Sequence, residues 1–170
     1  ATHARQQGCT VIYIFDKQGV IGLIALSDTL RPDSAQTIKD IESTGAKSVL
    51  LTGDATQAAQ HIAGRAGIAD VRANCMPEDK LLAIRQFEAD GEPVCMVGDG
   101  INDAPALKAA QVGIAMGSIG SDIAIEAADI ALVSDDIKAI PHLLLLSRKV
   151  MRTININLTA SMVLNFAAIG

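Results

Sequence analysis

The stretch Gly98-Asp99-Gly100-Ile101-Asn102-Asp103-Ala104-Pro105-Ala106-Leu107 decides the fold of this chain. It follows an apolar run at residues 94–97 and places two acids four positions apart, where a strand is expected to turn into a helix. The glycines permit a tight turn close to a ligand, and the amides that open the next helix favour an anion. Because Asp99 and Asp103 supply the hard oxygen ligands that Mg²⁺ prefers, the stretch predicts a Mg²⁺ site beside a phosphoryl group. A capped turn with solvated acids is the alternative.

Size and composition limit the classes of protein to consider. The 170 residues, of which 49% are hydrophobic, can bury one substantial core. The net charge of −5 and the scattered lysines and arginines provide no basic stripe, so nucleic acid is not expected as a partner. The three cysteines form no C-x-x-C pair, which argues against a disulfide framework or a zinc cage and favours a reducing, cytoplasmic setting.

Short apolar runs alternate with segments of helical periodicity along most of the chain. Helices are expected at residues 33–43, 55–66, 77–89 and 104–110, with a last one beginning near residue 136, and strands at 10–15, 20–26, 47–51, 94–97, 112–116 and 130–133. The repeated strand–helix–strand order predicts an α/β fold with a Rossmann-like parallel sheet and helices on both faces. In such a fold, ligands bind at the carboxyl ends of the strands.

Two further polar segments follow expected strands or open expected helices. Thr52 ends the strand at 47–51, and its hydroxyl can donate to a phosphoryl oxygen, while Asp54 can cap the following helix. Lys80 lies in the first turn of a helix, where a cation is unfavourable to the helix dipole, which suggests another purpose. An ordinary solvated lysine is the alternative. Together with the 98–107 stretch, Thr52 and Lys80 are predicted to neutralise phosphoryl charge while Asp99 holds Mg²⁺.

The order of these motifs resembles the haloacid dehalogenase superfamily, and their residues are similar to those of the phosphorylation domain of P-type cation ATPases. Asn157-Leu158 and Asn165 resemble the corresponding helix of the heavy-metal subgroup. The resemblance rests on residues 25–33, 51–54, 76–80, 96–107 and 113–117. It implies that Thr52 binds the phosphoryl group, that Lys80 neutralises it and that Asp99 ligates Mg²⁺. The residues so implied are Thr52, Lys80 and Asn102 as catalytic residues, Thr52, Gly53 and Asp54 at the cofactor ATP, and Asp99 and Asp103 at Mg²⁺.

The nucleophile of that family is missing from the chain. A P-type ATPase forms an aspartyl phosphate in an Asp-Lys-Thr-Gly-Thr motif, and Asp16-Lys17-Gln18-Gly19-Val20 lacks both threonines. Too few residues separate Asp16 from Thr52 to hold a nucleotide-binding domain. Residues 16–19 are therefore interpreted as a hairpin turn in which Gly19 takes a positive φ. The sheet is expected to lack the strand that carries the nucleophile, and the chain alone is expected to be inactive.

Two alternatives remain open at this point. One is a stand-alone Mg²⁺-dependent phosphatase of the same superfamily with Asp16 as its nucleophile. The other is a non-catalytic docking module that binds Mg²⁺ and phosphate without turnover. The first would hydrolyse a small phosphate ester, and the second would not.

The resemblance and the uncharged run at residues 153–170 together predict a domain division. Residues 1–18 are expected to end a nucleotide-binding domain or to form a linker, 19–150 to form the C-terminal part of the phosphorylation domain, and 151–170 to start a transmembrane helix. Lys149 and Arg152 would lie at the membrane interface. A truncated core helix is the alternative.

The expected function follows from the same resemblance. The intact protein is expected to be a multi-pass membrane protein that couples ATP hydrolysis, through an aspartyl phosphate, to transport of a heavy-metal cation. This domain is expected on the cytoplasmic side, with the membrane, the transported cation and other domains of the same chain as partners. The asparagines at 155, 157 and 165 are candidates for packing or ion contact, and the identity of the cation stays open.

Overall fold

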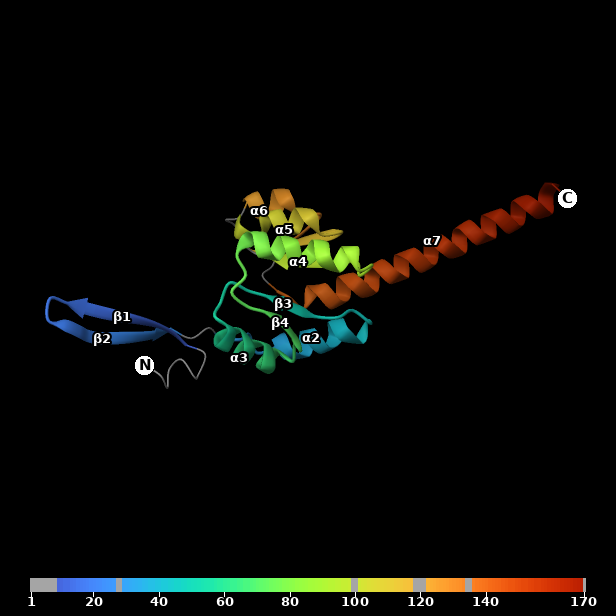
Figure 1. The fold of residues 1–170 in the computed structure, drawn as a ribbon. Helices are drawn as coiled ribbons and strands as arrows, with labels where there is room; N and C mark the ends of the chain where they lie inside the picture. Colours follow the sequence, from blue (N-terminus) through green and yellow to red (C-terminus); the bar gives the residue numbers. More distant parts are fainter. Residues whose placement is uncertain (1–8, 27–28, 99–100, 118–121, 134–135, 170) are drawn as a thin grey trace.

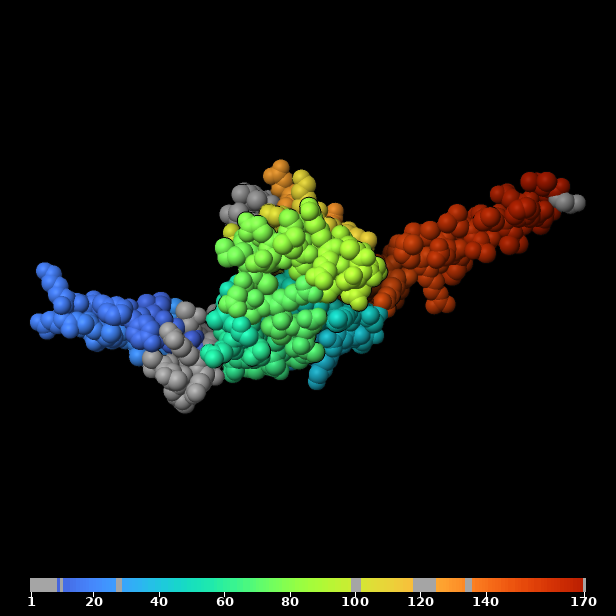
Figure 2. Space-filling model, viewed as in Figure 1, coloured from blue at the N-terminus to red at the C-terminus, as the bar shows by residue number. Residues whose placement is uncertain are grey.

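The computed structural model describes residues 9–26, 29–98, 101–117, 122–133 and 136–169 (Figure 1). A central body of short strands and helices carries a hairpin on one side and a long helix on the other, as Figure 2 also shows. The strands are β1 (Thr10–Asp16), β2 (Gly19–Leu26), β3 (Val49–Leu51), β4 (Asp70–Arg72), β5 (Cys95–Gly98), β6 (Val112–Met116) and β7 (Ile130–Leu132). The helices are α2 (Ser34–Ser43), α3 (Thr56–Ala66), α4 (Pro77–Ala89), the 3₁₀ turn η1 (Ile101–Asp103), α5 (Ala104–Ala109), α6 (Asp122–Ala127) and α7 (Ala139–Ile169).

Strands β1 and β2 form an antiparallel hairpin that projects from the body (Figure 1). The pairing runs from Thr10 opposite Leu26 to Asp16 opposite Gly19, and Gly19 has a φ of +131°. The interpretation of residues 16–19 as a hairpin turn is confirmed. The domain boundary predicted between residues 18 and 19 falls inside this turn, and the domain division stays a prediction.

The remaining strands form two separate parallel sheets. One contains β3 and β4, and the other contains β5, β6 and β7 in that order. The α/β class predicted from the sequence is confirmed, but its sheet is divided. Among the described residues, β3 pairs only with β4, and β5 pairs only with β6. The other edge of β3 and the other edge of β5 are therefore unpaired in this part of the chain.

The helices lie on both sides of the strands. Helices α4, α5 and α6 lie on one side and α2 and α3 on the other (Figure 1). The core cluster consists of Ile84, Met96, Ala106, Leu107, Ala110 and Ala115. A Cβ on Gly113 would lie 2.5 Å from the carbonyl oxygen of Leu107, so a glycine is required where α5 approaches β6. This packing fixes the position of the 98–107 stretch, because α5 lies in the core cluster.

Helix α7 packs on the body only near its start. Ile140 and Pro141 are buried, whereas most side chains beyond residue 144 are exposed. Two contacts tie the start of α7 to the two ends of α2. Lys138, just before α7, has its Nζ 2.6 Å from Oδ2 of Asp33, the N-cap of α2, and the Arg148 guanidinium donates to the carbonyl oxygen of Thr44, the C-cap of α2. Neither α7 nor any other helix of the described residues combines the length and apolarity that crossing a membrane requires.

Candidate active site

The turn after β3 is held by the hydroxyl of Thr52. Thr52 Oγ1 donates to Asp54 Oδ2 at 2.8 Å and accepts from the Asp54 amide at 3.2 Å. The Thr52 amide donates to the Arg72 carbonyl at 3.0 Å, which extends the pairing of β3 with β4 by one residue. The hydroxyl proton of Thr52 is therefore directed at Asp54, and it must turn away from that carboxylate before it can donate to a phosphoryl oxygen.

The predicted capping role of Asp54 is wrong. Ala55, not Asp54, is the N-cap residue of α3, and no side chain caps this helix. The physical reason is that the carboxylate of Asp54 accepts from the hydroxyl of Thr52 instead. Asp54 consequently belongs to the turn after β3 rather than to the helix that follows.

Lys80 is paired with an acid from a distant segment. Helix α4 begins at Pro77, and the Asp79 side chain accepts from the Met76 amide at 2.9 Å. One turn into this helix, Lys80 Nζ lies 2.6 Å from Asp103 Oδ1, and the two side chains are only 15% and 13% exposed. A charge-assisted hydrogen bond in a mostly buried position explains why a cation occupies the first turn of a helix.

The strand and the helix predicted on either side of residues 99 and 100 are both present. Strand β5 ends at Gly98, and η1 and α5 follow. A Cβ on Gly98 would lie 2.8 Å from Asp103 Cβ and 2.9 Å from Asp103 Oδ2, so only glycine leaves room for the acid. The side chain of Asn102 is exposed in η1. Asp99 and Gly100 lie outside the described residues.

A cleft of about 390 Å³ collects several of these groups. It lies at the carboxyl ends of β5 and β6 and beside the turn after β3, where the α/β fold predicts a site. The residues that line it are Thr29, Leu30, Arg31, Ser34, Asp54, Ile62, Val97, Gly98, Asp103, Met116 and Ile137. Asp54 and Asp103 thus face one cavity, and their partners Thr52 and Lys80 contact its walls. Gly53 and Asn102 do not line the cleft.

Asp16 lies outside this cleft. Its strand is antiparallel and belongs to the projecting hairpin, and its Oδ1 accepts from the Gln18 amide at 2.7 Å within the turn. Of the residues that line the cleft, the acids are Asp54 and Asp103. A nucleophilic role for Asp16 therefore has no support in the geometry.

The donor set of the cleft suits Mg²⁺ better than a softer ion. The described residues contain no group of three His, Cys, Asp or Glu side chains that could hold a metal. Mg²⁺ is commonly held by one or two carboxylates together with water and phosphate oxygens, which is the kind of site that one or two aspartates can provide. Asp103 Oδ1 is engaged by Lys80, so Oδ2 is the oxygen of this side chain that a cation would use.

Two residues that were not predicted from the sequence, Arg31 and Asn74, lie at or near the site. Arg31 lines the cleft just before α2, and its signal was its place in the 25–33 stretch that carries the resemblance. Asn74 contacts the turn after β3, and an asparagine between a strand and a helix is a weak signal for a left-handed turn.

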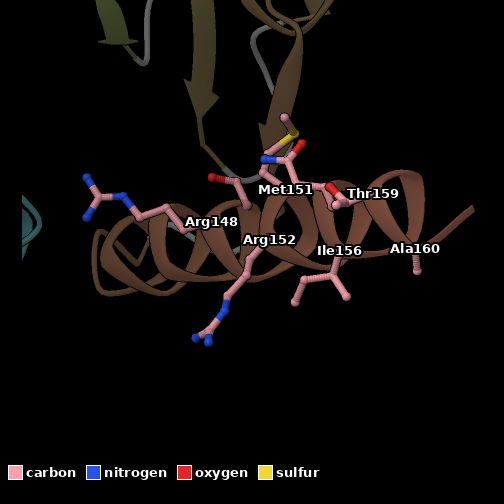
Figure 3. Close-up of a pocket in the computed structure, with 8 residues that line it drawn as sticks. Arg148, Met151, Arg152, Ile156, Thr159 and Ala160 are labelled. Carbon is pink, nitrogen blue, oxygen red and sulfur yellow. The ribbon is translucent and has the colours of Figure 1, made fainter. Parts of the chain in front are cut away.

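A larger hollow of about 740 Å³ lies along α7, remote from the cleft (Figure 3). Its lining residues are Ser147, Arg148, Met151, Arg152, Asn155, Ile156, Thr159 and Ala160. All eight residues come from α7, so among the described residues no second element closes the hollow. We assign no ligand to it.

Comparison with known families agrees with this geometry. A haloacid dehalogenase-like hydrolase family matches residues 2–111, and a second family of the same description matches residues 80–144. The chain belongs to the haloacid dehalogenase-like hydrolase family. The matched residues include Thr52, which follows β3, Lys80 in α4 and Asp103 in η1.

Individual relatives of this haloacid dehalogenase-like chain are heavy-metal P-type ATPases. It is 40% identical over 169 residues to a probable cadmium-transporting ATPase of Alkalihalophilus pseudofirmus, covering 99% of this chain and 23% of that protein. It is 41% identical over 162 residues to a zinc-transporting ATPase of Bacillus subtilis, covering 95% of this chain and 25% of that protein. The chain thus spans about a quarter of the length of these relatives.

A solved structure gives the same result for the fold. The crystal structure of a zinc-transporting PIB-type ATPase in its E2.Pi state superposes with a TM-score of 0.81 at 42% identity. The superposition covers 93% of this chain and 26% of the crystallised protein. The resemblance to heavy-metal P-type ATPases that the motifs indicated is confirmed in both sequence and fold.

Proposed function

We propose that this chain forms most of the phosphorylation domain of a P-type ATPase that couples ATP hydrolysis to transport of a heavy-metal cation. The observation that carries the proposal is the pair of Lys80 and Asp103 beside a cleft at the carboxyl ends of parallel strands. A mostly buried cation next to such a cleft is suited to binding an oxyanion, because its charge is little screened by water.

In this proposal, the phosphoryl group is bound from two sides, by Lys80 with its partner Asp103 and by Thr52 with the amides that follow it. The Lys80 ammonium keeps its protons and offsets the negative charge of the phosphoryl oxygens, while Asp103 fixes its position through the 2.6 Å contact. The Thr52 hydroxyl releases Asp54 and donates to a phosphoryl oxygen, and the amides after Thr52 do the same. Asn102 would contact the phosphoryl group and Gly53 would contact ATP, although neither residue lines the cleft in the chain alone.

Mg²⁺ would be held by Asp99 and by Asp103 through Oδ2. When bound, the ion supplies positive charge that withdraws electron density from a phosphoryl oxygen. Arg31, which lines the same cleft, adds a further positive charge on the wall that leads into α2. In this proposal, Lys80 and Arg31 supply positive charge for the anion, and Asp99 and Asp103 bind the metal.

The aspartate that becomes phosphorylated would come from a part of the intact protein outside these 170 residues. A second cavity, of about 540 Å³, lies at the amino ends of the strands and is lined by residues of both β3 and β5. The first cavity is lined by Asp54, just after β3, and by Gly98 of β5, so the two cavities lie at opposite ends of these strands. One added parallel strand would join the two sheets and present a residue at its carboxyl end to Thr52 and Lys80.

The transported ion and the membrane location are inferred from the relatives. The relatives include a probable cadmium-transporting and a zinc-transporting ATPase, so we propose a heavy-metal cation of that class as the cargo. The domain would lie on the cytoplasmic side of a membrane, with ATP and other domains of the same protein as its partners. The uncharged run at 153–170 supports the proposal that residues 151–170 start a transmembrane helix, and the hairpin would adjoin the nucleotide-binding domain.

Phosphoenzyme formation from ATP in the full-length protein tests this function. Asp99→Asn is expected to abolish Mg²⁺-dependent phosphorylation, and Lys80→Ala is expected to reduce it by about 100-fold or more, because each removes charge from the site. Asp90→Asn, at the exposed end of α4 away from the cleft, is the matched control and should be phosphorylated normally. Normal phosphorylation of the Asp99 variant would overturn the proposal. So would hydrolysis of a small phosphate ester by these 170 residues that Asp16→Asn abolishes.

A further inference from the structure

A short segment connects the two halves of the candidate site. Residues 73–75 follow β4 and are joined through Met76, the N-cap residue, to α4, the helix that carries Lys80. Cys75 lies against the turn after β3, since a Cβ on Gly53 would lie 3.4 Å from the Cys75 carbonyl oxygen. We name residues 73–75 the linking turn. Its conformation determines how the Thr52 turn is placed relative to α4.

The backbone of the linking turn is left-handed at Asn74. This residue has a φ of +54°, and within the described part of the chain it is the one non-glycine residue with a positive φ. Asparagine tolerates this region better than other residues with a Cβ, but glycine tolerates it best. The backbone alone therefore does not explain why the side chain of asparagine is present.

Both the backbone and the side chain of Asn74 bind the turn after β3. Its amide donates to the Asp54 carbonyl at 2.8 Å, and its Nδ2 donates to Thr56 Oγ1 at 3.0 Å. The next amide of the linking turn, that of Cys75, donates to the Thr52 carbonyl at 2.9 Å. Donors of the linking turn thus hold residues 52, 54 and 56, which alternate along the turn that carries the Thr52 hydroxyl.

We propose that Asn74 is a positioning residue for phosphoryl binding. Its hydrogen bonds to the Asp54 carbonyl and to the Thr56 hydroxyl fix the backbone of residues 54–56, and so set the direction in which the amides after Thr52 point. It acts through Thr52 and Asp54 and does not line the cleft itself. The inference rests on the proposed function, because it assigns Asn74 to the phosphoryl group that the cleft would bind.

Variants of Asn74 and Thr56 separate this role from a general effect on the fold. Asn74→Gly keeps the left-handed backbone and removes the amide side chain, and Thr56→Val removes the hydroxyl that accepts from it. Thr56→Ser keeps that hydroxyl and serves as the conservative variant. Gln60→Ala, on an exposed position one turn further along α3, is the matched control. Each variant is prepared in the 170-residue chain, and its thermal unfolding midpoint is measured first.

The probe is inorganic phosphate, titrated in the presence of Mg²⁺ while the amide resonances of residues 52–54 are followed by NMR. The Kd for phosphate is expected to rise about three- to tenfold in Asn74→Gly and in Thr56→Val, the effect of one lost hydrogen bond on positioning. Thr56→Ser and Gln60→Ala should bind as the parent chain does. The double variant Asn74→Gly with Thr56→Val should be no weaker than either single variant, because both remove the same contact.

The outcomes distinguish the two proposals. Unchanged phosphate affinity in Asn74→Gly, or a lowered unfolding midpoint with unchanged affinity, would overturn the positioning role and leave the proposed function intact. Absence of phosphate binding by the parent chain, or equal binding by the parent and by Lys80→Ala, would overturn the proposed function itself. Additive losses in the double variant would show that Asn74 and Thr56 act separately and would also overturn the proposal.

Discussion

At the scale of single residues, the pair of Lys80 and Asp103 is the feature on which the site depends. Both residues were candidates from the sequence alone, but they are separated by many positions and nothing in the sequence indicates that their side chains meet. The pairing arises because α4 and α5 pack side by side on the core cluster. Motif order therefore predicted which residues matter, and the packing of two helices determined which contact they make.

The stability of the folded chain should depend strongly on this pair. Lys80→Ala leaves a mostly buried carboxylate without its cation and is expected to lower the free energy of unfolding by about 3 kcal/mol. Lys47 and Asp70 provide a matched control, because they form a 3.6 Å pair in which Lys47 is 65% exposed. Lys47→Ala should cost less than about 1 kcal/mol. Chemical denaturation measures both, and similar losses in the two variants would contradict the structure.

The side chain of Asp54 has two possible partners, and the sequence does not indicate which one it binds. Asp54 was expected to cap α3, because aspartate before a helix favours that role. The hydroxyl of Thr52 lies two positions away and takes the carboxylate instead. Short-range competition of this kind depends on the angle of the turn after β3, which the sequence does not specify.

At the scale of elements, long periodic segments were predicted and short polar ones were not. Helices α3 and α4 begin and end within one residue of their expected limits. Strand β4 was missed, because Asp70-Val71-Arg72 contains one apolar residue and has no strand pattern. It forms because β3 offers a parallel partner and because Arg72 lies 4.4 Å from the ring of Phe87 in α4. Its place in the sheet is set by neighbours that are distant in sequence.

The contact that joins α7 to the N-terminal end of α2 should be visible in the titration of one lysine. A hydrogen bond to Asp33, together with its negative charge, raises the pKa of Lys138 above the ordinary value of 10.5. The contact stabilises the folded chain fully below pH 10.5 and is lost as the pH rises through the higher folded value. NMR titration of the Lys138 side chain measures this pKa. Asp33→Asn should return it towards 10.5, and an unchanged pKa in that variant would refute the contact.

At the scale of the whole molecule, the body and its projections should differ in local stability. The hairpin exposes apolar side chains along its length, including Phe15 at 66% and Ile21 at 64%. An isolated two-stranded hairpin is at best marginally stable in water. The amides of β1 and β2 should therefore exchange with solvent orders of magnitude faster than those of β6, which is buried in the body. Hydrogen exchange followed by NMR measures both in one sample, and equal protection would contradict the arrangement.

The division of the parallel sheet into two was predicted from the sequence only through a missing motif. The missing Asp-Lys-Thr-Gly-Thr motif predicted a missing strand, and the unpaired edges of β3 and β5 agree with that expectation. The projection of the hairpin away from the body was not predicted. Strand patterns report which faces are apolar, and they do not report how a hairpin is oriented relative to a sheet with which it shares no pairing.

Because α7 is attached to α2 only near its start, a small rotation of the body would become a larger displacement at the far end of this helix. Contacts at Lys138 and Arg148 fix its first ten residues or so to the body, and the remaining part, to Ile169, extends for about 30 Å at about 1.5 Å per residue. A rotation of the body by about 10° would move the far end of the helix by about 5 Å, if the helix stays straight. The cleft is bounded by Ile137, by Arg31 and by Ser34, the first residue of α2, so a change in its width would act where α7 is attached to α2.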